Sequence, residues 1–176
     1  ILHIDPGTAF GTGMHETTQL CIRQMKKYIT PDSVLLDIGT GSGILGILAL
    51  MYGASKVYAT DLDPCAVNAV LDNLDNNSVD RDRFELIIGN IIDDEQIRDW
   101  AGYDRYDIVM ANILADVLVP LMPAAAAALK KGGVMITSGI IEGKEDIVAD
   151  AMTQNGLEIM DISTQGEWKS VTGRKI

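Results

Sequence analysis

Short apolar runs alternate along the chain with segments that have helical character. The runs have the length of buried strands and lie at residues 34–37, 56–60, 84–88, 106–110 and 134–138. Helices are predicted at residues 17–28, 44–52, 64–76, 93–99, 117–129 and 142–155. Apolar and polar residues alternate over 157–163 and 168–175, which predicts two strands. The short link between these segments predicts a hairpin.

This order of elements predicts an α/β fold. Five alternations of strand and helix are typical of a parallel sheet with helices on both faces, joined by right-handed crossovers. A Lys-Lys-Gly-Gly turn at 130–133 is expected before the fifth strand, and the closing hairpin adds an antiparallel strand. We expect one domain, in which a loop and helix at 1–30 cover the ligand site of a sheet core at 33–176.

A glycine-rich stretch connects the first predicted strand to the next helix, with the sequence Asp37-Ile38-Gly39-Thr40-Gly41-Ser42-Gly43. Glycines open backbone conformations closed to other residues and allow a ligand to approach the main chain. Unpaired N–H groups at the start of a helix favour an anionic or carboxylate-bearing ligand. Asp37 suits a cationic group. The stretch therefore predicts a nucleotide-cofactor loop with Gly39 and Gly41 at the ligand.

Three further polar residues, Asp61, Asn90 and Asn112, come at the ends of the second, third and fourth strands. In open parallel sheets ligands bind outside the carboxyl ends of the strands, so these side chains are expected at one site. Asp61 can accept hydrogen bonds from two ribose hydroxyls. Asn90 can either bind an adenine edge or serve only as a turn residue.

Two cofactors fit the glycine loop. Residues 41–46 satisfy G-x-G-x-x-G, and Asp61 lies near the spacing expected for a dinucleotide. Alternatively, an acid followed by G-x-G-x-G suits S-adenosylmethionine, whose methionyl end carries both an ammonium and a carboxylate. The sequence offers no separate site for hydride transfer. No metal site is expected, because the two histidines and two cysteines show no ligand spacing.

Composition and charge narrow the possible binding partners and cellular locations of the protein. The net charge of −11 argues against a broad nucleic-acid surface and is compatible with a basic protein partner or with simple solubility. The apolar runs are much shorter than a membrane span, and the first residues do not resemble a signal peptide. Cys21 and Cys65 are expected to be reduced core residues, which suits the cytoplasm. Because the first residue is not Met, we expect a fragment or one domain of a longer protein.

The segment Asp5-Pro6-Gly7-Thr8-Ala9-Phe10-Gly11-Thr12-Gly13-Met14-His15-Glu16-Thr17-Thr18 closely resembles the signature of the bacterial ribosomal protein L11 methyltransferase (PrmA) family. The resemblance continues at 37–45, 61–64, 111–115, 138–140 and 166–168 and covers almost the whole chain. It implies a Rossmann-like class I methyltransferase fold with seven strands, and S-adenosylmethionine as cofactor. It also implies methylation of amino groups, on lysine side chains or the N-terminus, of ribosomal protein L11.

The resemblance also assigns residues. Thr18, Gly39, Asp61 and Asn112 match the family's cofactor contacts, while Phe10 and Gly11 belong to a loop expected to close over the cofactor. Asn112 and the backbone carbonyl of Ile113 are expected to accept hydrogen bonds from the target amine, which makes them the catalytic candidates. The resemblance also leads us to expect that the family's N-terminal substrate-recognition domain is not part of this chain.

Other function classes stay open at this point. They are a methyltransferase acting on another protein, a small molecule or nucleic acid; a cofactor-binding module inactive without its missing domain; and a nicotinamide oxidoreductase. The acidic charge and the N-terminal motif count against the nucleic-acid version.

Overall fold

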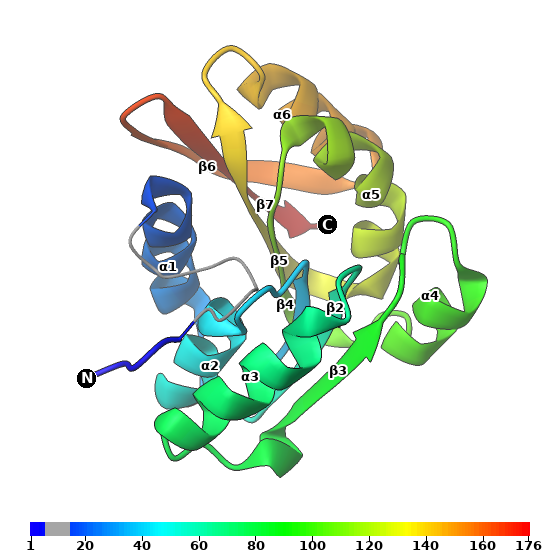
Figure 1. Cartoon of the computed structure of the whole chain (residues 1–176). Helices are drawn as coiled ribbons and strands as arrows, with labels where there is room; N and C mark the ends of the chain where they lie inside the picture. Colours follow the sequence, from blue (N-terminus) through cyan, green and yellow to red (C-terminus); the bar gives the residue numbers. More distant parts are fainter. Residues whose placement is uncertain (6–14) are drawn as a thin grey trace.

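A computed structural model describes residues 1–5 and 15–176 and is built around one seven-stranded sheet (Figure 1). The strands are β1 Val34–Ile38, β2 Lys56–Asp61, β3 Phe84–Ile88, β4 Tyr106–Asn112, β5 Leu129–Ile141, β6 Leu157–Gln165 and β7 Trp168–Lys175. Their order is β3-β2-β1-β4-β5-β7-β6. Strands β1 to β5 run parallel, and β7 is antiparallel to both β5 and β6. The predicted α/β class and mostly parallel sheet are confirmed.

Helices cover both faces of the sheet. They are α1 Glu16–Tyr28, α2 Ile44–Met51, α3 Cys65–Asn76, α4 Glu95–Ala101, α5 Ala115–Ala128 and α6 Glu145–Gln154, with a short 3-10 turn, η1, at Arg81–Arg83. Buried side chains of α1, α2 and α3 form one apolar cluster, and those of α4, α5 and α6 form a second. In Figure 1, α2 and α3 lie on one side of the sheet and α5 and α6 on the other.

The strand sequences explain this two-sided core. Successive side chains of a strand point to opposite faces, and in β1 Leu35 belongs to the α1–α3 cluster while Leu36 belongs to the other. Ile108 and Val109 divide in the same way in β4. A strand buried on both faces needs a continuous apolar run, which is the pattern that the sequence carries.

Two local predictions are corrected. The expected turn at 130–133 interrupts β5 rather than preceding it, because β5 pairs with β4 at Leu129 and again from Val134. Cys65 is exposed rather than buried, whereas Cys21 is buried as expected. Cys65 is the first residue of α3, and the buried stripe of that helix begins one residue later, at Ala66.

Helix α1 packs against the last strands of the chain. The Gln24 side-chain amide donates to Asp161 Oδ2 at 2.7 Å and to Ser163 Oγ at 3.0 Å, both on β6. The Gln165 amide donates to Gln19 Oε1 at 2.7 Å. These bonds connect α1, near the start of the chain, to β6, near its end.

Gly46 marks a close approach of α2 to the sheet. A Cβ at this position would lie 2.6 Å from Phe84 Cε2 and 2.9 Å from Val57 Cγ1. In an exposed helix Gly→Ala stabilises by about 1 kcal/mol, but here overpacking should dominate. We expect Gly46→Ala to lower the free energy of unfolding by about 1–3 kcal/mol in urea denaturation.

The matched control compares Met51→Ala with Met51→Gly at the exposed end of the same helix, where only helix propensity differs. A stabilised Gly46→Ala protein would contradict the close packing.

Candidate cofactor site

Two adjoining cavities lie at the carboxyl ends of the parallel strands. Their volumes are about 320 Å³ and about 270 Å³. Gly39, Asp61, Leu62 and Ile113 line both, so the two cavities lie side by side at this edge of the sheet. This is the edge where open α/β sheets bind their ligands.

The glycine loop forms the floor of the smaller cavity. Gly39, Gly41 and Gly43 have φ values of +75°, +58° and +84°, a left-handed region that glycine adopts without strain. The N–H groups of Gly39 and Thr40 donate to the Thr60 carbonyl at 2.8 and 3.1 Å. The loop is therefore folded back over the end of β2.

Asp61 ends β2 and faces this loop. Its Oδ2 accepts from the Gly41 N–H at 2.8 Å, and its Oδ1 accepts from the Asp63 N–H at 2.9 Å. Each carboxylate oxygen can accept more than one hydrogen bond. Asp61 can thus hold the loop and still accept from two hydroxyls of a ligand.

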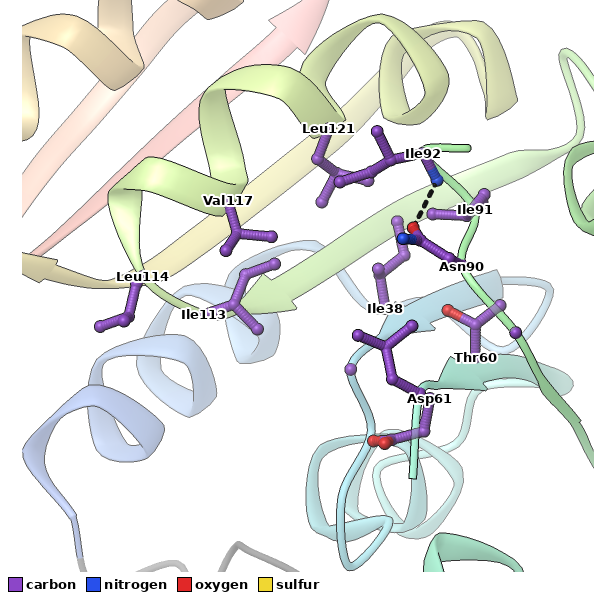
Figure 2. Close-up of a pocket in the computed structure, with 13 residues that line it drawn as sticks. Ile38, Thr60, Asp61, Asn90, Ile91, Ile92, Ile113, Leu114, Val117 and Leu121 are labelled. Carbon is purple, nitrogen blue, oxygen red and sulfur yellow. Dashed lines mark hydrogen bonds between the residues drawn. The ribbon is translucent and has the colours of Figure 1, made fainter. Parts of the chain in front are cut away.

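The larger cavity is mainly apolar (Figure 2). Its apolar side chains are Ile38, Leu62, Ile91, Ile92, Ile113, Leu114, Val117 and Leu121. Asn90 also lines it, with Oδ1 accepting from the Ile92 N–H at 3.0 Å and Nδ2 donating to Asp93 at 3.1 Å. The Asn90 amide therefore organises its own turn, and its contact with an adenine stays a prediction.

Asn112 and Thr18 meet in the smaller cavity. Asn112 Nδ2 donates to Thr18 Oγ1 at 3.2 Å, which joins the end of β4 to the first turn of α1. No donor among the described residues contacts Asn112 Oδ1, so this oxygen can accept from a ligand. The Ile113 N–H donates to the Ser138 carbonyl at 3.1 Å, and a Cβ at Gly139 would lie 2.7 Å from the Ile113 oxygen. The absence of a side chain at Gly139 thus leaves room for the Ile113 carbonyl.

Asp37 lies buried beside the glycine loop. Its Oδ2 accepts from Thr40 Oγ1 at 2.7 Å, while its Oδ1 has no hydrogen-bond partner among residues 1–5 and 15–176. Burial raises the pKa of Asp37 to about 6; the hydrogen bond from Thr40 opposes this rise and the charge of Asp61 adds to it. A buried acid with one unpartnered oxygen fits a nearby cationic donor.

The structure brings most of the predicted site residues together. Thr18, Gly39, Gly41, Asp61, Asn112 and Ile113 all line the smaller cavity, and Asn90 lines the larger one. Phe10 and Gly11 lie outside the described residues. The apolar wall of the larger cavity was not predicted, although Ile91 and Ile92 directly follow a strand-end residue and could have indicated it.

The part of the chain that the structure describes contains no helix long and apolar enough to cross a bilayer. It also contains no group of three or more His, Cys, Asp or Glu side chains arranged to hold a metal ion.

The family model described as "Ribosomal protein L11 methyltransferase (PrmA)" matches residues 1–176. The chain belongs to the ribosomal protein L11 methyltransferase family. A relative with that name from Lachnospira eligens is 51% identical over 176 residues, and one from Agathobacter rectalis is 47% identical over 179. These alignments cover 99% and 100% of this chain but 55% of each relative, so the chain spans about half the length of these members of the family.

Solved structures agree with this membership. A crystal structure described as a ribosomal protein L11 methylase from Lactobacillus delbrueckii subsp. bulgaricus superposes with a TM-score of 0.86 at 31% identity, covering 99% of this chain and 86% of that one. A putative methyltransferase, SMU.776, complexed with SAH, superposes with a TM-score of 0.77 over 94% of this chain and 51% of that chain. At 13% identity the second likeness shows the shared methyltransferase fold alone.

Asp37 should make stability depend on pH. Its pKa in the folded protein is about 6, against an ordinary value of 3.8, so the folded state binds the proton more tightly. The associated stability is complete below about pH 4 and is lost as pH rises through about 6. Asp37→Asn cannot ionise, so its free energy of unfolding should rise relative to wild type by about 2 kcal/mol between pH 4 and pH 7.

Denaturant titrations across this pH range measure the difference. Asp116→Asn, at an exposed position paired with Lys144, is the control and should track wild type. Parallel curves for wild type and Asp37→Asn would show that Asp37 ionises normally.

Proposed function

We propose that residues 1–176 form the catalytic domain of an S-adenosylmethionine-dependent methyltransferase that methylates amino groups of ribosomal protein L11. The observation that carries this proposal is the Asn112 side chain, held by Thr18 with its Oδ1 open to a ligand, beside the glycine loop. The names of the relatives from Lachnospira eligens and Agathobacter rectalis support the choice of substrate.

The described residues fit this cofactor. Backbone N–H groups in the first turn of α2, where Ile44 and Leu45 line the smaller cavity, would bind the methionyl carboxylate. The unpartnered Asp37 oxygen would bind the ammonium, directly or through a water. Asp61 would accept from the ribose hydroxyls, and the apolar cavity beside Asn90 would hold the adenine. When bound, the cofactor supplies a methyl group already activated on a sulfonium.

The task of the protein is then mainly positioning. Well-oriented reactants can save about 7–11 kcal/mol of an activation barrier. Asn112 Oδ1 and the Ile113 carbonyl would accept hydrogen bonds from the target amine and direct its lone pair toward the methyl group. Thr18 would keep Asn112 in the orientation that leaves its oxygen free, because Thr18 accepts from the amide nitrogen.

The amine must lose a proton before it reacts, since only the neutral amine has a lone pair. Neither Asn112 nor a backbone carbonyl is a strong base. The apolar walls at Leu62, Ile113 and Leu114 would instead lower the pKa of a bound amine, because desolvation disfavours its charged form. The proton would leave to solvent.

The net charge of −11 is suited to a basic ribosomal protein partner and gives no reason to expect direct nucleic-acid binding. A cytoplasmic location follows from this substrate.

One alternative has an observation in its favour. Because the chain spans 55% of the length of its relatives, it could bind the cofactor and remain inactive alone. A methyl-transfer assay on purified L11, run in parallel with this chain and with a full-length relative, separates the two. Stabilisation of the chain by NAD but not by S-adenosylmethionine in thermal unfolding would overturn both readings.

Asn112→Ala should lower the methyl-transfer rate by roughly tenfold to a hundredfold, because it removes one oriented hydrogen bond to the amine. The affinity for S-adenosylhomocysteine should change little. Single-turnover transfer and calorimetry measure the two quantities. Asn155→Ala makes the same replacement at the end of α6, away from the site, and serves as the control. An unchanged rate in Asn112→Ala would remove Asn112 from the mechanism.

Asp61→Ala should weaken binding of S-adenosylhomocysteine by about 1–3 kcal/mol, since the ribose hydroxyls lose a charged acceptor. Titration calorimetry measures the change, again with Asp116→Asn as the exposed-acid control. Wild-type affinity in Asp61→Ala would show that the ribose assignment is wrong.

A further inference from the structure

The first five residues run along α3 and are bound to it by two asparagine side chains. The His3 N–H donates to Asn77 Oδ1 at 2.7 Å, and Asn77 Nδ2 donates back to the His3 carbonyl at 2.6 Å. The Asp5 N–H donates to Asn73 Oδ1, and Asn73 Nδ2 donates to the Asp5 carbonyl, both at 2.8 Å. Each asparagine side chain thus binds both the N–H and the carbonyl of one residue, as the backbone of a neighbouring strand would.

The spacing of the two pairs explains how a helix can do this. Residues two apart in an extended segment are about 6.6 Å apart, and residues four apart in a helix rise by about 6 Å. Asn73 and Asn77 therefore match alternate residues of the segment. Ile4, between the two paired residues, and Leu2, just before His3, pack against the apolar cluster of α1, α2 and α3.

Asn73 makes one contact that Asn77 does not. Its Nδ2 also donates to the Ser42 carbonyl in the glycine loop at 2.9 Å. Asn73 is completely buried, and both its amide hydrogens and its oxygen are used. Asparagine is a poor helix former, so its presence inside α3 indicates a role beyond the helix.

This contact fixes one peptide unit of the loop from both sides. Asn73 holds the Ser42 carbonyl, and the N–H of the same peptide unit, at Gly43, donates to the Thr40 carbonyl at 2.9 Å. Gly43 itself lies against α3, since a Cβ there would be 3.0 Å from Val70 Cγ2. Val70 and Asn73 are three residues apart, so one face of α3 supports the loop.

We propose that Asn73 is a positioning residue for the cofactor loop, and that it joins the segment 1–5 to the loop through a single buried amide. The consequence for cofactor affinity rests on the proposed function; the support of the loop does not. Without Asn73, the Ser42 carbonyl would be buried without this partner, and the Ser42–Gly43 peptide would lose the restraint that Asn73 provides.

The test compares Asn73→Ala with Asn77→Ala. Both lose a two-bond pair with the segment 1–5, but only Asn73→Ala releases the loop. Hydrogen exchange at the Gly43 amide, without cofactor, should be about tenfold faster in Asn73→Ala and unchanged in Asn77→Ala. The Kd for S-adenosylhomocysteine should rise by about tenfold in Asn73→Ala and by less than about twofold in Asn77→Ala.

The two measurements separate the two hypotheses. Equal loop exchange in both variants would overturn the positioning role, whatever the affinities. Faster exchange in Asn73→Ala, with no binding by wild type, would keep that role and overturn the proposed function. If Asn73→Ala does not fold, Asn73→Leu retains the volume without the hydrogen bonds and is compared with Asn77→Leu in the same way.

Discussion

The hydrogen bond from the Gly41 N–H to the Asp61 carboxylate is the contact on which the geometry of the site depends. It joins the loop after β1 to the end of β2, two points twenty residues apart in sequence. The N–H groups of Gly39 and Thr40 bind the neighbouring Thr60 carbonyl, so the loop closes over one strand end. Because the loop needs left-handed backbone at alternate residues, only a glycine-rich sequence can make these contacts without strain.

The same arrangement places two acids near each other. Asp61 accepts hydrogen bonds from two backbone N–H groups, whereas Asp37 is buried with one oxygen unpartnered. Burial raises the pKa of Asp37 to about 6, and the nearby charge of Asp61 adds to this rise. A positively charged group of a ligand would interact favourably with these two acids. The apolar wall of the larger cavity can contact a flat, uncharged part of the same ligand.

Much of the fold could be predicted because the strands are buried on both faces and therefore appear as continuous apolar runs. The placement of Asp61 and Asn112 at one cavity could be predicted, because parallel strands present their carboxyl ends at the same edge of a sheet. Other features could not be predicted, because they depend on tertiary contacts. From the sequence alone, Asn73 is expected to be a polar residue on an exposed helix face, although the fold buries it. The exposure of Cys65 depends on where the buried stripe of α3 begins.

The placement of α1 has a consequence for how the chain folds. Its polar partners Asp161 and Ser163 follow Gln24 by 137 and 139 residues, so the helix completes its contacts only after nearly all the chain has been synthesised. Contacts of such long range slow folding, since much loop-closure entropy is lost before they form. Thr18 lies on the same helix and is held by Asn112 across 94 residues. The smaller cavity, which Thr18 and Asn112 both line, therefore depends on a contact of long range between the first helix and β4.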